Sequence, residues 1–269
     1  MKQILLLYLL WTSTNVVFGQ VDTVEIYSKV MVRSIPNLVI TPKDYTDQND
    51  ELPVIYLLHG AGGYFSNWFF RVPEIEQYAT DYNIIIVCPD GGKTSWYLDS
   101  PIDPGSQYES YITRELVPAI DQKYRTIKQK HGRAITGLSM GGHGAFYLAF
   151  RNQDIWGAAG SMSGGVDLIP FAEEWNIDEI LGPYSENKST WEEHTVINMT
   201  QLLNGELKII FDCGSEDFFA DVNATLHKKL VSEGIPHEYT VRPGTHNWEY
   251  WRGSIKNHLR FFNDFFQQH

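Results

Sequence analysis

The stretch Arg133-Ala-Ile-Thr-Gly-Leu-Ser-Met-Gly-Gly-His-Gly144 decides how the rest of the chain is interpreted. Its first four residues are typical of a short buried strand, the next five fit the pattern G-x-S-x-G, and residues 142–151 are typical of a helix. On such a strand–turn–helix the serine adopts a strained backbone conformation, and glycines on either side avoid steric collisions. The turn lifts the hydroxyl above the sheet edge, so the sequence predicts Ser139 as a nucleophile.

A nucleophilic serine needs a base that takes its proton and an acid that orients the base. Among the histidines after Ser139, His246 is best placed, because it lies in a loop that follows a strand expected at residues 237–241. His227 and His258 fall within predicted helices, where an exposed structural histidine is the ordinary expectation. The sequence therefore favours His246 as the base.

The acid is expected in the loop after the preceding strand, predicted at residues 207–213, since acid and base follow the serine in that order in enzymes with this turn. Three carboxylates are candidates there. We favour Asp217, which comes just before a predicted helix, over Glu216 and over Asp212, which is still on the strand.

A second glycine-rich loop, His59-Gly-Ala-Gly-Gly63, follows the apolar run at residues 53–58. A loop of this kind after the third strand supplies a backbone amide to the oxyanion that develops during acyl transfer. We expect the amides of Ala61 and Met140 to converge on that oxyanion.

The chain of 269 residues, 43% of them hydrophobic, suits one large α/β domain with a substantial core. Apolar strand-like runs alternate with helical patterns, which predicts a mostly parallel sheet with helices on both faces. Pro118 should kink or interrupt a helix expected at residues 108–124. Residues 164–204 show no clear periodicity, and we interpret them as an insertion over the active site.

The net charge of −12 argues against nucleic acid or an anionic membrane surface as a partner. No spacing of cysteine and histidine resembles a zinc site, so neither a metal nor another cofactor is expected. Cys88 and Cys213 each end an apolar run, and we expect buried, unpaired thiols.

Residues 1–19 have the pattern of a signal peptide. Lys2 is their only charge, residues 4–11 form an apolar core too short to span a bilayer, and small residues flank the expected cleavage site after Gly19. We therefore predict a secreted or periplasmic protein whose single domain covers residues 20–269.

Four segments together resemble a known family. They are Leu57-Leu-His-Gly60, Ile135-Thr-Gly-Leu-Ser-Met-Gly-Gly-His143, Asp212-Cys-Gly-Ser-Glu-Asp217 and Gly244-Thr-His-Asn-Trp-Glu-Tyr-Trp251. They are similar to the putative-esterase (esterase D-like) family of α/β-hydrolases, nearest the feruloyl and acetyl-xylan esterases of carbohydrate esterase family 1. The resemblance implies an eight-stranded α/β-hydrolase fold in strand order 1-2-4-3-5-6-7-8, with the insertion after strand six. It also implies catalytic roles for Ser139, Asp217 and His246.

The resemblance points to an exported serine esterase that removes acetyl or feruloyl groups from plant polysaccharide or oligosaccharide. Alternatives are a general short-chain (tributyrin-type) carboxylesterase acting on small esters, an acyltransferase, or a non-catalytic binding protein with the same fold. The intact serine, acid and histidine argue against the last. Of the aromatic residues near the predicted rim, we choose Trp68, Trp96 and Trp248 as a platform for the acyl group or sugar.

Overall fold

The computed structural model describes residues 20–47 and 49–268, so the signal peptide predicted for residues 1–19 lies outside the described residues. Its centre is an eight-stranded sheet with the order β1-β2-β4-β3-β5-β6-β7-β8. The pairs β1–β2 and β2–β4 are antiparallel, and every other neighbouring pair is parallel. The predicted eight-stranded, mostly parallel sheet is confirmed. The strands are β1 (Val21–Ser28), β2 (Arg33–Ile40), β3 (Val54–Leu58), β4 (Ile85–Pro89), β5 (Arg133–Gly137), β6 (Ala158–Met162), β7 (Lys208–Gly214) and β8 (Glu238–Arg242).

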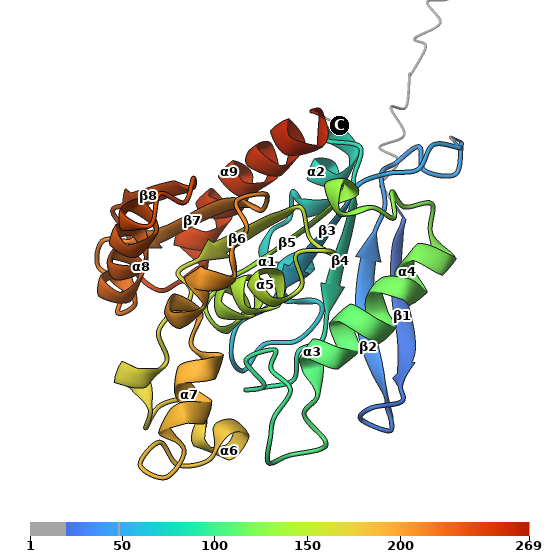
Figure 1. The fold of residues 1–269 in the computed structure, drawn as a ribbon. Coiled ribbons are helices and arrows are strands. Elements are labelled where there is room, and N and C mark those ends of the chain that lie inside the picture. Colours follow the sequence, from blue (N-terminus) through green and yellow to red (C-terminus); the bar gives the residue numbers. More distant parts are fainter. Residues whose placement is uncertain (1–19, 48, 269) are drawn as a thin grey trace, which may run out of the picture.

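Helices cover both faces of the sheet, as Figure 1 shows. The central strand β3 explains why, since all five of its side chains are fully buried and point alternately into two hydrophobic cores. One face of the sheet carries α1 (Asn67–Arg71), α2 (Ile75–Asp81) and α9 (Trp248–Phe266); the other carries α3 (Tyr108–Ser110), α4 (Val117–Lys123), α5 (Met140–Arg151) and α8 (Ala220–Ser232).

No helix in the described part of the chain is long and apolar enough to cross a membrane.

The helix expected at residues 108–124 is interrupted, as predicted. Between α3 and α4 the chain forms a π-helical segment, Tyr111–Leu116, and Pro118 follows in the first turn of α4. A proline has no N–H and its ring crowds the carbonyl four residues earlier, so a widened π turn accommodates it better than a regular α turn.

The insertion between β6 and β7 consists of short helices, which accounts for its lack of a sustained hydrophobic period. It packs around the fully buried Trp191, whose indole N–H donates to the Gly182 carbonyl oxygen at 2.8 Å. One of its residues, Trp175, lines the same cavity as Ser139. Its elements are 3₁₀ segments at Ile169–Phe171 and Val196–Leu202 and the helices α6 (Asp178–Leu181) and α7 (Lys188–His194).

The two cysteines are unpaired and buried. Cys88 lies in β4 and Cys213 in β7, four strand positions apart in the sheet. At about 4.8 Å per strand that separation is about 19 Å, whereas a disulfide needs Cα atoms within about 7 Å. Burial raises the pKa of both thiols, which keeps them protonated and inert.

Candidate active site

Ser139 sits on a strained turn between β5 and α5. Its φ and ψ of 56° and −119° lie in a region that side chains rarely adopt, as the motif predicted. The turn is packed too closely for any residue except glycine at the two flanking positions. A Cβ at Gly137 would lie 2.5 Å from the Gly141 carbonyl oxygen, and a Cβ at Gly141 would lie 2.6 Å from that of His59. The glycines on either side of Ser139 therefore have a direct steric cause.

The structure brings Ser139, His246 and Asp217 into one hydrogen-bonded row. The Ser139 Oγ lies 2.9 Å from His246 Nε2, and His246 Nδ1 lies 2.9 and 3.0 Å from the two carboxylate oxygens of Asp217. Because the carboxylate accepts, Nδ1 carries the imidazole proton, and Nε2 is left to accept from the serine hydroxyl. Asp217 is sealed from solvent at 0% side-chain exposure, whereas His246 retains 15%.

Backbone contacts hold the acid and base loops together. The Glu216 amide donates to the Gly244 carbonyl oxygen at 3.0 Å, which joins the loop after β7 to the loop after β8. The Phe219 amide donates to Asp217 Oδ1 at 2.9 Å and fixes the carboxylate. The side chain of Glu216 is exposed and makes no hydrogen bond to His246 within the described residues. Of the three candidate acids, Asp217 is therefore the one that orients His246.

Asp212 belongs to a different pair, inside the protein. Its carboxylate accepts from the Ser254 hydroxyl at 2.6 Å and lies 3.1 Å from His258 Nε2, while His258 Nδ1 lies 2.8 Å from the Thr136 hydroxyl. Burial raises the pKa of Asp212, but the hydrogen bonds and charges of His258, Ser254 and Arg242 outweigh it and hold the pKa below its usual value. Asp212 thus ties β7 to α9.

The amides expected at the oxyanion are available as donors. Among the described residues, neither the Ala61 nor the Met140 N–H donates a hydrogen bond, and Met140 is the first residue of α5, whose N–H has no partner within the helix. Ala61 lines the same cavity as Ser139. Their convergence on one oxyanion stays a prediction.

His59 fixes the glycine-rich loop, a role that the sequence did not reveal. The Gly91 amide donates to its Nε2 at 2.8 Å, so Nδ1 carries the proton and donates to the Gly60 carbonyl oxygen at 2.9 Å. Burial lowers the pKa of His59 and keeps the ring neutral. The ring therefore holds the loop that carries Ala61 without bringing a charge to the site.

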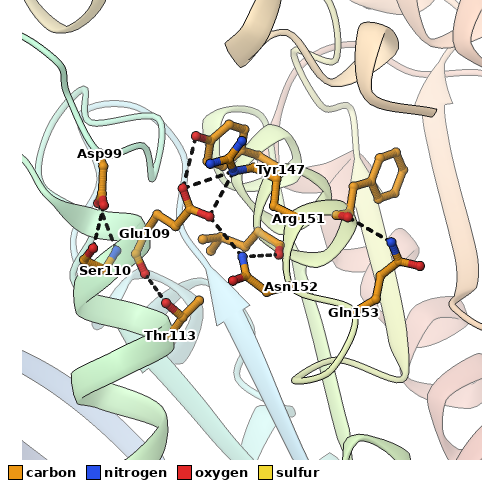
Figure 2. Close-up of polar contacts among 10 residues, drawn as sticks. Asp99, Glu109, Ser110, Thr113, Tyr147, Arg151, Asn152 and Gln153 are labelled. Carbon is orange, nitrogen blue, oxygen red and sulfur yellow. Dashed lines mark hydrogen bonds and ion pairs between the residues drawn. The ribbon is translucent and has the colours of Figure 1, made fainter. Parts of the chain in front are cut away.

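The far end of α5 is anchored by Glu109 of α3 (Figure 2). Its carboxylate accepts from the Tyr147 hydroxyl at 3.2 Å, from Arg151 Nε at 3.0 Å and from Asn152 Nδ2 at 3.0 Å. These three donors lie at the carboxyl end of the helix that begins just after Ser139. The contacts join the C-terminal half of α5 to α3.

A cavity of about 440 Å³ opens over Ser139 and His246. Cavities of about 510 and 680 Å³ lie elsewhere on the molecule, but neither contains a member of the Ser139 row. One wall of the serine cavity is the glycine-rich loop at residues 60–63. The other side chains at its wall are Tyr64, Asn67, Arg71, Leu138, Trp175, Phe218, Trp248 and Trp251.

The prediction of a substrate platform is wrong for two of its three tryptophans. Trp68 is fully buried, and its indole N–H donates to the Leu58 carbonyl oxygen at 2.9 Å, so it belongs to the core under α1. Trp96 is 1% exposed and does not line the cavity. Only Trp248 does, partly exposed. Large aromatic side chains near an active site are more often core than contact surface.

Trp175 and Phe218 complete the aromatic wall. Trp175 comes from the insertion, and its ring centroid lies 5.6 Å from that of Phe218, whose ring in turn lies 4.2 Å from His246. Trp175 and Asn176 both have positive φ, of 51° and 54°. Such strained residues cluster at functional sites and persist because the surrounding packing holds them. No local pattern marked Trp175, since its segment has no regular period.

Known proteins that are similar to this chain include several esterases. The family model described as "Putative esterase" matches residues 28–262. An esterase of Mycobacterium tuberculosis is 28% identical over 235 residues, which is 77% of this chain, and this chain spans about half (51%) of that protein's length. An acetyl esterase of Caldicellulosiruptor saccharolyticus is 24% identical over 87% of this chain and 94% of its own. The solved structure of a ferulic acid esterase superposes with a TM-score of 0.79 at 28% identity, covering 93% of this chain and 99% of that one. The protein belongs to the Putative esterase family and has its α/β-hydrolase fold.

Proposed function

We propose that the protein is a serine esterase that hydrolyses carboxylic esters through an acyl-enzyme intermediate. The observation that carries this proposal is the unbroken row from the Ser139 hydroxyl through His246 to Asp217, with 2.9 Å at each step. Membership of an esterase family supports the same reaction class.

The row can perform both halves of the reaction. Ser139 Oγ bonds to the ester carbonyl carbon while His246 Nε2 takes the serine proton, and the carbonyl oxygen becomes an oxyanion that the Ala61 and Met140 amides would stabilise. The oxyanion collapses, the alcohol leaves and His246 returns the proton to it. Water then attacks the acyl-enzyme with His246 as base, which releases the acid and restores Ser139. Asp217 holds the imidazole and stabilises its cationic form.

For the substrate we propose acetyl or feruloyl esters on plant polysaccharide or oligosaccharide. The partly exposed aromatic faces of Trp175, Phe218 and Trp248 support this, because such faces suit a sugar ring or a planar acyl group. An acetyl esterase and a ferulic acid esterase among the similar proteins point the same way. Action outside the cytoplasm, as a secreted or periplasmic enzyme, is part of the proposal and rests on residues 1–19.

Two measurements test the proposal in sequence. A fluorophosphonate probe should label the protein and fail to label Ser139→Ala; absence of labelling on the wild type would favour a non-catalytic binding protein. Hydrolysis of acetylated xylo-oligosaccharide, methyl ferulate, short 4-nitrophenyl esters and a long-chain triglyceride should then rank the triglyceride last. A preference for long acyl chains would reject the carbohydrate substrate while leaving the serine mechanism intact.

A further inference from the structure

The cavity over Ser139 contains a charged side chain that the reaction does not use, Arg71. Every other side chain at the cavity wall is uncharged or belongs to the catalytic row. Resting on the esterase function proposed above, we propose that Arg71 binds a carboxylate on the substrate, so that the preferred esters are anionic. Such an ester carries its carboxylate either on the alcohol, as in a uronic acid unit of the glycan, or on the acyl group, as in a dicarboxylic half-ester.

Arg71 has no acidic partner of its own. Among residues 20–47 and 49–268, no carboxylate forms an ion pair with its guanidinium, and the side chain is exposed. Acidic residues outnumber basic ones in this chain by 33 to 21. An arginine without an acidic partner in the cavity over Ser139 is therefore unexpected from the composition. Asp217, the carboxylate of the Ser139 row, is paired with His246 and its side chain is 0% exposed. The charge of Arg71 is therefore available to a ligand.

The surrounding residues hold Arg71 in place. It ends α1, and Arg252 of α9 donates through Nε to its carbonyl oxygen, which ties this end of α1 to α9. The guanidinium carbon lies 6.0 Å from the ring centroid of Trp248, within range of a cation–π contact. Trp248 meets the buried Trp68 edge to face at 5.1 Å. The contact with Arg252 fixes the backbone of Arg71, and the indole of Trp248 gives its guanidinium an aromatic neighbour.

A second donor lies one helical turn before Arg71. Asn67 and Arg71 are four residues apart on α1, a spacing that places side chains on the same face, and both line the cavity. Asn67 Oδ1 accepts from the Tyr64 amide at 2.8 Å, which turns the NH₂ group away from the backbone as a donor without a partner among the described residues. A guanidinium fork beside an amide NH₂ matches the two oxygens of a carboxylate.

The test compares matched charged and neutral esters. One pair carries the charge on the acyl side: 4-nitrophenyl hydrogen glutarate and 4-nitrophenyl valerate. The other carries it on the alcohol side: a mono-acetylated methyl glucuronide and the corresponding methyl glucoside. For each enzyme, the ratio of kcat/KM for the charged ester to that for the neutral ester cancels any loss common to both. The pair of esters whose ratio changes in the Arg71 variants identifies whether the acyl group or the alcohol carries the carboxylate.

Arg71→Gln should lower that ratio about tenfold or more in one pair, the size expected for loss of one charge-assisted hydrogen bond. The ratio for Arg71→Lys should lie between those of the wild type and Arg71→Gln, because lysine keeps the charge and loses the guanidinium fork. Arg260→Gln, the same change at an exposed arginine of α9 that does not line the cavity, is the matched control and should leave both ratios unaltered. Circular dichroism confirms that each variant is folded.

The proposal is overturned if Arg71→Gln leaves both ratios within about twofold of the wild type, or if Arg260→Gln shifts them equally. Wild-type turnover of the neutral esters reports on the esterase function by itself. An enzyme that cleaves neutral esters and shows no discrimination through Arg71 would therefore reject the carboxylate site alone, whereas inactivity toward all four esters would reject both.

Discussion

Two aspartate–histidine pairs in this molecule look nearly the same and should behave very differently. Asp212 lies within β7 and Asp217 in the loop that follows it, and each is joined to a histidine in the C-terminal part of the chain. Each row continues to a hydroxyl group within 2.9 Å of the imidazole. The two rows are Asp217–His246–Ser139 and Asp212–His258–Thr136.

Access and backbone strain distinguish the two rows. His246 is 15% exposed and faces a cavity, whereas His258 is fully buried. Ser139 stands on a strained turn at the start of a helix with a free amide beside it, whereas Thr136 lies inside β5, where its backbone belongs to the sheet. We therefore expect only the Ser139 row to be catalytic, because catalysis also needs access for the substrate and donors for the oxyanion.

The largest expected effect is on kcat, and it distinguishes the Ser139 hydroxyl from the Thr136 hydroxyl. Ser139→Ala and His246→Ala should each lower kcat by about 10⁴- to 10⁶-fold, and the double variant should be scarcely worse, since the residues act as one unit. Thr136→Val, which removes the other hydroxyl at similar volume, should keep kcat within a few-fold. Steady-state kinetics on a 4-nitrophenyl ester measures this. Substantial turnover by purified Ser139→Ala would contradict the serine mechanism.

Substitution of Asp217 should affect kcat, whereas substitution of Asp212 should affect stability. Asp217→Asn should lower kcat about 10⁴-fold, because His246 loses the acceptor that sets its tautomer. Asp212→Asn should retain most of kcat and instead lower the free energy of unfolding by about 3 kcal/mol, as expected when a buried pair is broken. Kinetics and urea unfolding on both variants decide this. If Asp212→Asn were the more severe catalytic lesion, Asp217 would be the wrong acid.

The amides predicted to bind the oxyanion, those of Ala61 and Met140, lie beside the Ser139 row, so we expect their removal to affect catalysis. Ala61→Pro deletes the amide hydrogen and should lower kcat about 100- to 1000-fold. Ala61→Gly keeps that hydrogen and is the control, with a loss of less than about tenfold. Equal activity in the proline and glycine variants, with circular dichroism unchanged, would remove Ala61 from the oxyanion site.

The smallest effect concerns acid stability and belongs to the buried row. The pKa of Asp212 in the folded protein lies below its ordinary value, so its charged form contributes stability that is fully present above about pH 4 and is lost as pH falls through the folded-state pKa. The difference in unfolding free energy between wild type and Asp212→Asn should therefore be constant near neutrality and shrink in acid. A difference that grows with acidification would mean that the pKa is raised instead.

The sequence was most informative where function depends on local pattern and chain order. The turn at Ser139 needs glycine at both flanking positions for steric reasons, and the acid and base lie in the loops after β7 and β8. The helix α9, Trp248–Phe266, is also marked by local pattern, because its amphipathic pattern extends over 19 residues.

Burial of single aromatic side chains could not be predicted in the same way. Trp68 and Trp248 each follow an asparagine, yet Trp68 is in the core and Trp248 lines the cavity, which depends on how α1 and α9 pack against each other. Trp175 reaches the cavity from an insertion without a regular period. The network around Glu109 joins residues about 40 positions apart, and no local pattern encodes such a pairing.

The position of β8 at the edge of the sheet has a consequence for how the protein should lose activity on heating. This strand pairs with β7 alone, and none of its five residues is buried, yet it leads directly into the loop that carries His246. Few contacts oppose its local opening, so its amide hydrogens should exchange sooner than those of the central strand β5. The proposed nucleophile thus follows a fully buried strand, whereas its proposed base follows an edge strand without a buried residue. On mild heating, activity should disappear through fraying of this edge while the core is still folded.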